Sequence, residues 1–363
     1  TGEDAVTVLG DANQLDSLLQ QAAEAVYERT QPYRFASFLR QRGPSQFRRA
    51  TAIYQQLAVD GAPMDRLWAH VGLSALYSRS DPMRASSEAY KAVAMDPNLA
   101  IAQNDIYLSE SPIGHDEAAL AGAKASLNLY RSAGGQMTEN ARIISELITK
   151  ANVAEALGSY ADAVHYNRQA TRSADYNGVA ETSRENVAFD LAEQHDTRAA
   201  RAIWATLPAL TSKEFSAYRA INDVQLPFWM GDWPRVVAKR QSVEHALEGA
   251  IGSSGLTAQW ADVSRERLIR PYVAIALALT GDFSGADTLV RKTPRDCYIC
   301  IRARARIAAV EKNWKGADYW FANAVKQAPS IPFAYAEWGR MLMAKGDLDG
   351  AIAKLEAAHQ KGR

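Results

Sequence analysis

Apolar residues recur every three or four positions along most of the chain, which is the spacing of one face of an α-helix. Glycine and proline fall between such runs, as in Gly43-Pro44, Asp81-Pro82 and Asp96-Pro97. No stretch alternates apolar and polar residues with the β-branched enrichment of a strand. The pattern predicts amphipathic helices joined by short turns, and therefore an all-α fold. Two runs show it most plainly: Leu15, Leu18, Leu19, Ala22, Ala23, Val26 and Tyr27, and then Ile352, Leu355 and Ala358.

The helical pattern repeats at a fixed interval. Near the C-terminus, Trp314-Lys-Gly-Ala317-x3-Phe321-x2-Ala324 is followed by Leu348-Asp-Gly-Ala351-x3-Leu355-x2-Ala358, each matched residue lying 34 positions further on. Shorter copies begin at Gly158, Gly231 and Gly281. The glycine can end one helix in a left-handed conformation, and the polar residue after it can cap the next helix. Because the alanine lets two helices approach closely, the repeat predicts a unit of two antiparallel helices.

This unit resembles the tetratricopeptide repeat, a helix–turn–helix of 34 residues. The first helix of that repeat has a large residue followed by an apolar and small pair, as in Trp68-x2-Val71-Gly72 and Tyr335-x2-Trp338-Gly339. The resemblance implies a single domain over residues 1–363, an all-α, right-handed α-solenoid of tandem antiparallel helix pairs. It places clear units at about 65–98, 144–177, 181–214, 267–297, 298–331 and 332–363, and weaker ones at about 30–62, 99–132 and 217–250.

Some segments depart from the repeat. The unit at 267–297 is three residues short, and the glycine- and serine-rich stretch at about 244–266 is expected to be an irregular loop. The sequence does not fix the register between 99 and 143. The last unit stops at Arg363, where the exit from its second helix should begin. We therefore expect a fragment of a longer protein, or a solenoid that ends against a partner.

Composition and charge exclude several classes of protein. The 363 residues include 41 lysines and arginines against 41 aspartates and glutamates, and 47% are hydrophobic. These values exclude a disordered chain, a collagen-like chain and a disulfide scaffold. A zero net charge predicts no direct binding to nucleic acid or to an anionic membrane, and the longest apolar run, Tyr272 to Leu279, is too short to span a bilayer. Two cysteines and no leader favour a cytoplasmic location, while a periplasmic one stays open if a leader was removed.

Candidate catalytic and metal-binding groups form no constellation in the sequence. The phosphate-binding, nucleophile-elbow and HExxH motifs are absent. Gly114-His115-Asp116-Glu117 and Glu193-Gln194-His195-Asp196 place carboxylates beside imidazoles, but at predicted turns, where we expect solvated side chains. Cys297-Tyr-Ile-Cys300 leaves three alternatives: buried packing residues, which we favour, a redox pair, or two of four zinc ligands. We predict no catalysis, no cofactor and no metal.

Five residues are candidates for binding a partner: Phe228, Trp229, Arg302, Arg306 and Arg340. The two aromatic residues fall at the end of a first helix, on the side expected to face the groove, and core filling is the alternative. The three arginines fall on the inner side of two adjacent first helices. Surface charge, or an internal salt bridge to Glu337, would account for them without a partner. Otherwise they would accept a carboxylate or a phosphate.

The resemblance implies a non-catalytic scaffold that binds a protein or peptide in its concave groove, with an acidic segment as the expected ligand of the arginines. The alternative is a sensory or regulatory repeat segment of a larger bacterial signalling or transcription-regulatory protein. An enzyme with its site in the irregular segment would rest on analogy of fold alone. The sequence does not indicate an oligomeric state.

Overall fold

The computed structural model describes residues 7–130, 137–173, 177–207, 213–253 and 255–363. Helices and turns make up these ranges, which contain no β-strand, so the all-α prediction is confirmed. The α-helices are α1 (Leu15–Thr30), α2 (Pro32–Gln41), α3 (Phe47–Asp60), α4 (Pro63–Tyr77), α5 (Pro82–Met95), α6 (Ala100–Glu110), α7 (Asp116–Tyr130), α8 (Glu139–Ala156), α9 (Tyr160–Ser173), α10 (Asn177–Glu193), α11 (Thr197–Ala205), α12 (Lys213–Trp229), α13 (Trp233–Ala250), α14 (Ala258–Val263), α15 (Arg270–Leu279), α16 (Phe283–Arg291), α17 (Tyr298–Val310), α18 (Trp314–Gln327), α19 (Phe333–Lys345) and α20 (Leu348–Lys361).

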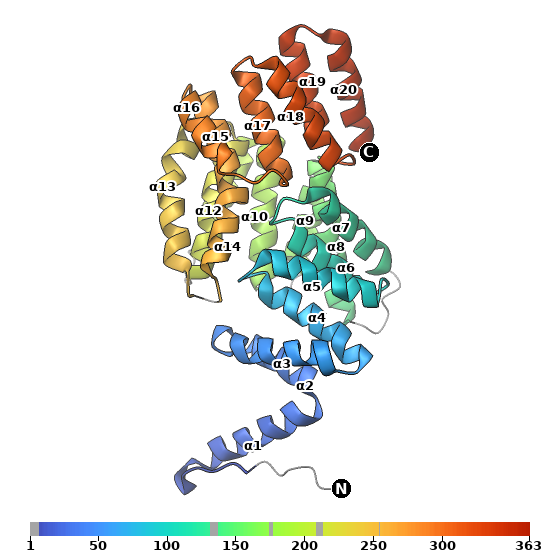
Figure 1. Ribbon diagram of the computed structural model, residues 1–363, viewed down its shortest axis with the longest axis vertical. Helices are drawn as coiled ribbons and strands as arrows, with labels where there is room; N and C mark the ends of the chain where they lie inside the picture. Colours follow the sequence, from blue (N-terminus) through green and yellow to red (C-terminus); the bar gives the residue numbers. More distant parts are fainter. Residues whose placement is uncertain (1–6, 131–136, 174–176, 208–212, 254) are drawn as a thin grey trace.

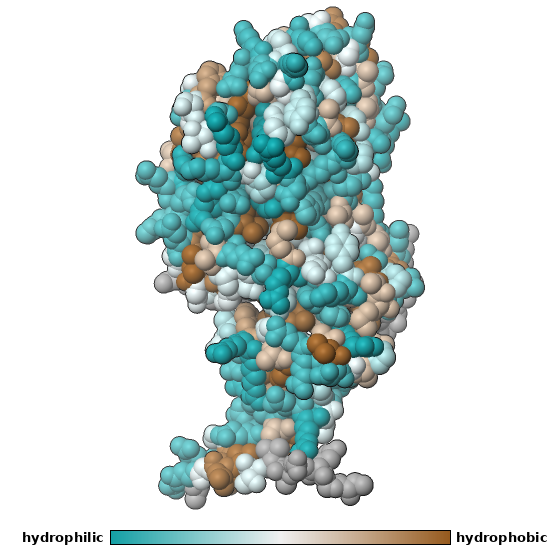
Figure 2. All heavy atoms as spheres, in the orientation of Figure 1, coloured by the Kyte–Doolittle hydropathy of each residue, from teal (hydrophilic) through white to brown (hydrophobic). Residues whose placement is uncertain are grey.

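Consecutive helices pack against each other as antiparallel pairs (Figure 1). The most extensive contacts are those of α4 with α5, α6 with α7, α8 with α9, α9 with α10, α12 with α13, α17 with α18 and α19 with α20. The face of the molecule in Figure 2 is mainly hydrophilic, because each amphipathic helix turns its apolar side towards its neighbours. The predicted array of tandem helix pairs is confirmed.

The turn within each pair uses the chemistry that the sequence pattern indicated. Gly281 and Gly346 have φ angles of 92° and 90°, which places them in the left-handed region. The aspartate that follows each of them caps the next helix by accepting a hydrogen bond from a backbone N–H. Two equivalent turns hold His195 and Lys312 with φ angles of 64° and 60°. The turn therefore keeps its shape without glycine.

The small residue of the repeat lies where the two helices of a pair cross. Ala317 and its equivalents are almost completely buried, as predicted: Ala50, Ala163, Ala200, Val236, Ala286 and Ala351. Glycine serves the same purpose between helices at Gly72, where a Cβ atom would meet the Tyr54 ring at 2.5 Å. The spacing of small residues therefore sets how closely neighbouring helices approach.

The irregular segment is shorter than the sequence suggested. Helix α13 continues to Ala250, and α14 begins at Ala258, so the non-helical part is confined to about a third of the expected stretch 244–266. The reason is that Val243, Leu247 and Ala250 keep the helical apolar spacing and are buried in the core. A short π-helix, Ser264–Ile269, joins α14 to α15.

The array curls until the turn between α6 and α7 meets the start of α17. The backbone N–H of Tyr298 donates to the carbonyl oxygen of Gly114 at 2.8 Å, and that of Ser330 donates to Glu117 Oε2 at 3.0 Å. Leu120 also packs in one apolar cluster with Tyr298. Segments about 180 to 210 residues apart in sequence are thus in contact. The expected concave groove is consequently narrowed to a central cavity that stays open to solvent.

The apolar run Tyr272–Leu279 lies within α15 and belongs to the buried core. Among the helices that the structure describes, none combines the length and apolar character needed to cross a membrane.

Candidate functional site

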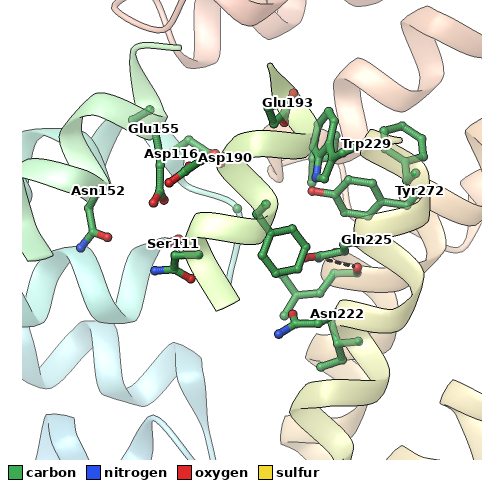
Figure 3. Close-up of a pocket in the computed structure, with 18 of the residues that line it drawn as sticks. Ser111, Asp116, Asn152, Glu155, Asp190, Glu193, Asn222, Gln225, Trp229 and Tyr272 are labelled. Atoms are coloured by element: carbon green, nitrogen blue, oxygen red, sulfur yellow. Dashed lines mark hydrogen bonds between the residues drawn. The ribbon is translucent and has the colours of Figure 1, made fainter. Parts of the chain in front are cut away.

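The central cavity has a volume of about 1290 Å³. Its lining comes mainly from the first helices of successive pairs, α8, α10, α12, α15, α17 and α19, with the start of α7 completing it. All five residues predicted to bind a partner border this cavity. The lining contains arginines, carboxyl groups and aromatic rings. Figure 3 shows Glu155, Asp116 and Asp190 on one side of the cavity, and Trp229 and Tyr272 on the other.

The first part of the lining, which we call the arginine wall, consists of Arg302, Arg306 and Arg340 together with Glu337. Arg302 on α17 donates two hydrogen bonds to Glu337 on α19, from Nε at 2.9 Å and from a terminal nitrogen at 2.6 Å. Both side chains are buried, each residue being 6% exposed. Burial alone would raise the pKa of Glu337, but the Arg302 guanidinium outweighs it, and the pKa is lowered. The internal salt bridge therefore accounts for Arg302.

Arg306 and Arg340 are less completely paired than Arg302. Arg306 lies 3.5 Å from Glu337 and stacks on the Phe228 ring, with its guanidinium carbon 5.1 Å from the ring centroid. Burial, together with the charges of Arg302 and Arg340, lowers the pKa of Arg306. Arg340 is exposed and forms no ion pair with any residue in the described ranges. Glu337 is thus the one carboxylate in ion-pair contact with the arginine wall among the described residues, while Glu193 and Asp116 act on Arg302 from further away. Arg306 and Arg340 are left without a close partner of their own.

The second part, the carboxyl wall, consists of Asp116, Glu155, Asp190 and Glu193 (Figure 3). The side-chain amide of Asn167 joins two of them by donating to Glu155 Oε1 and to Asp190 Oδ2, both at 3.1 Å. Within the part of the chain that the structure describes, no lysine or arginine forms an ion pair with these four carboxyl groups. The carboxyl wall is therefore not neutralised by salt bridges.

Burial raises the pKa of every member of the carboxyl wall. The pKa is raised to about 8 for Glu155 and Glu193, to about 7 for Asp190 and to about 6 for Asp116. For Glu155, the nearby charges of Asp190 and Glu193 add to the effect of burial. These carboxyl groups consequently retain protons close to neutral pH when nothing else neutralises them.

Two of these carboxyl groups correct an expectation from the sequence. His195 is exposed at its turn, as expected, although it also borders the cavity. Glu193 beside it and Asp116 beside His115 line the cavity and are only partly exposed. His115 itself pairs with Glu110 at 2.6 Å, next to the contact that closes the array. Closure explains the difference, because it turns the inner ends of these helices into the wall of a cavity.

Aromatic rings form the third part of the lining. The Trp229 and Tyr272 rings meet edge to face, with centroids 5.8 Å apart, and both border the cavity. Phe228 is only 1% exposed and belongs to the core beneath them. Phe228 therefore supports Arg306 and Trp229 from below and offers almost no surface of its own.

The two cysteines form a disulfide bond at the start of α17, and both are completely buried. The favoured interpretation of two packing thiols is therefore wrong about their chemistry, although right about their burial. Within the described residues, no group of three or more His, Cys, Asp or Glu side chains is arranged to hold a metal ion. The zinc alternative thus lacks its further ligands. The disulfide lies against Gly114, where a Cβ atom would meet Cys297 Sγ at 2.8 Å, so it sits at the point of closure.

Repeat pattern, paired helices and central cavity together define an all-α helical-repeat protein. No protein-family model matches the sequence, and no curated protein matches it either. Among solved structures, the chain is similar to the crystal structure of yeast Tom70, with 12% identity over 97% of this chain and 93% of that chain and a TM-score of 0.27. At that score the similarity carries no argument about function.

Proposed function

We propose that this chain is a non-catalytic helical-repeat module that takes a segment of a protein or peptide partner into its central cavity. The observation that supports the proposal most directly is the incomplete pairing of the arginine wall. Glu337 offers one negative charge to Arg302, Arg306 and Arg340. A carboxylate on the partner would neutralise Arg306 and Arg340 and form charge-assisted hydrogen bonds with them.

A sensory or regulatory role within a larger signalling protein is the second candidate. It is favoured by the closure of the array, because contacts such as Tyr298 to Gly114 join segments on opposite sides of the cavity. A ligand between these segments would alter their separation and so affect distant parts of the solenoid. The disulfide favours an oxidising compartment such as the periplasm for either role, since disulfides are rare in the cytosol.

The test of the proposed function is binding of a labelled peptide of alternating aspartate and glutamate, measured by fluorescence anisotropy at several salt concentrations. The double variant Arg306→Ala, Arg340→Ala should bind at least about tenfold more weakly, because two charge-assisted contacts are lost. Its affinity should also depend less steeply on salt.

The matched control is Arg235→Ala, Arg240→Ala on α13, which removes the same charge from exposed positions outside the cavity. This control should bind like the parent protein. An equal loss of affinity in both double variants would show that only net charge matters. An unchanged affinity in Arg306→Ala, Arg340→Ala, with the fold intact, would exclude the arginine wall as the binding site.

A further inference from the structure

The carboxyl wall lies in the same cavity as the arginine wall but has the opposite chemistry, and an acidic ligand does not explain it. Asp190 is only 2% exposed, and the single Asn167 amide is shared between it and Glu155. Four carboxyl groups border one cavity without an ion pair to any lysine or arginine of the described ranges. The charge of Arg302 partly offsets the effect of burial on the pKa of Glu193 and Asp116, whereas no positive charge of the described residues acts on Glu155 or Asp190. Buried carboxyl groups are either protonated or paired with a positive charge, so a bound cation would be the partner that Glu155 and Asp190 lack.

Asn152 provides an independent indication that a ligand belongs here. It lies one turn before Glu155 on α8, borders the cavity and is 8% exposed. Its side-chain amide forms no hydrogen bond with any residue that the structure describes. Its polar atoms open onto the cavity rather than into the packed core, so they remain available to a ligand there. A ligand that donates N–H groups would satisfy both the Asn152 oxygen and the neighbouring carboxyl oxygens.

The aromatic part of the lining suits the same kind of ligand. Figure 3 shows Trp229 and Tyr272 on the side of the cavity away from Glu155 and Asp190. Aromatic faces attract organic cations through their π electrons. A metal ion fits less well, because no cluster of three or more suitable ligands occurs among the described residues.

From this geometry we infer that the carboxyl wall, with Asn152, is a binding site for an organic cation that carries several N–H donors, an ammonium or guanidinium group. The inference rests on the proposed function, because it deepens the role of the same cavity. The carboxyl oxygens and the Asn152 carbonyl accept its N–H groups, and the aromatic rings cover its apolar part. A peptide ligand would then be held at both walls, by its acidic and its basic groups.

Binding of the cation should release protons. Burial raises the pKa of Glu155 to about 8 and that of Asp190 to about 7, so the empty site is partly protonated near neutral pH. An ammonium or guanidinium group favours the ionised carboxylates and displaces those protons. Proton release separates binding at this wall from attachment to exposed surface carboxylates, which are already ionised at that pH.

The test is isothermal titration calorimetry of the whole chain with two probes, a blocked tri-lysine peptide and spermidine, in two buffers of different ionisation enthalpy. The peptide represents a basic side chain, and spermidine represents a free polyamine. We expect binding that releases protons, and at least about a tenfold loss of affinity in Glu155→Gln, Asp190→Asn. The control Asp349→Asn, Glu356→Gln removes the same charge from the exposed face of α20 and should bind like the parent.

Each outcome decides between the alternatives. Binding of only one probe identifies the cationic ligand as a basic peptide or as a polyamine. Binding of both probes supports a site for any organic cation with several N–H donors. Failure of both probes at millimolar concentration, or equal affinity in the cavity variant, overturns the inference. If the acidic peptide still binds at the arginine wall in that case, the proposed function stands and only the cation site fails. If neither the acidic peptide nor the cations bind, both proposals fail.

Discussion

The variant Glu337→Gln tests whether the buried ion pair of the cavity holds two repeats together. Glu337 on α19 receives both hydrogen bonds of Arg302 on α17 and lies 3.5 Å from Arg306. Glutamine has almost the same shape, so the substitution removes the charge while leaving the packing in place. The variant therefore isolates the electrostatic contribution of one carboxylate.

The expected loss follows from the burial of Arg302. Removing one partner of a buried ion pair costs about 3–5 kcal/mol, because the other charge is left buried without compensation. Two features place this variant at the lower end of that range. The glutamine oxygen can still accept one hydrogen bond, and Arg302 keeps its contacts with the Tyr298 and Phe333 rings, 5.2 and 5.1 Å from its guanidinium carbon. We expect the free energy of unfolding to fall by about 3 kcal/mol.

The assay is urea unfolding followed by circular dichroism. Asp287→Asn serves as the control, because it removes an exposed carboxylate that pairs with Arg291 on the same helix and should cost at most about 0.5 kcal/mol. The double variant Arg302→Met, Glu337→Met should recover most of the loss, since the fully buried Arg302 is removed together with its partner, and Arg306 keeps its contact with the Phe228 ring. A loss below about 1 kcal/mol for Glu337→Gln would show that water in the cavity solvates Arg302, and would refute the reasoning.

Three further predictions concern packing and protonation. Gly72→Ala should lower the free energy of unfolding by about 1–3 kcal/mol in the same urea assay, because its Cβ would meet the Tyr54 ring. Gly249→Ala is the control, because open space surrounds it, and it should be neutral or stabilising by up to about 1 kcal/mol. Ala317→Trp or Ala351→Trp should cost at least about 1–3 kcal/mol in thermal melts, and a melting curve like that of the parent would mean that these alanines do not lie at the helix crossings. The melting temperature of the protein without ligand should decrease as the pH rises from about 5 to about 9. A melting temperature that does not change with pH would contradict the assignment of protonated carboxyl groups to the cavity.

The helices and their turns could be predicted because the information is local. Asp282 caps α16, and Gly281 precedes it with a positive φ angle, just as the repeated pattern indicated. The buried alanines follow from spacing alone. Even the unexpected left-handed residue Lys312 keeps the same position in its turn. Short-range rules of capping and periodicity are sufficient for each of these features.

The closure of the array could not be predicted in the same way. The contact between Gly114 and Tyr298 depends on small rotations summed over all the intervening helix pairs, and no local pattern records that sum. The disulfide and the carboxyl wall share this difficulty. Glu193 and Asp116 read as ordinary turn residues in the sequence, and only closure places them in a shared cavity. The arginines were easier to find, because Arg306 and Arg340 are 34 residues apart and so occupy equivalent places on neighbouring helices.

The direction of the pH dependence follows from linkage and connects stability to the proposed cation site. Burial raises the folded-state pKa of Glu155 from 4.5 to about 8, so the folded protein binds more protons than the unfolded chain between these values. The contribution of Glu155 to stability is therefore fully present below about pH 4.5 and is lost as the pH rises through about 8. His115 adds a loss of the same sign, because its hydrogen bond to Glu110 raises its pKa. The double variant Glu155→Gln, Asp190→Asn removes only the contribution of these two carboxyl groups. A bound cation replaces the lost protons, so spermidine should raise the melting temperature more at about pH 9 than at about pH 6. Equal stabilisation at both pH values would mean that spermidine binds elsewhere.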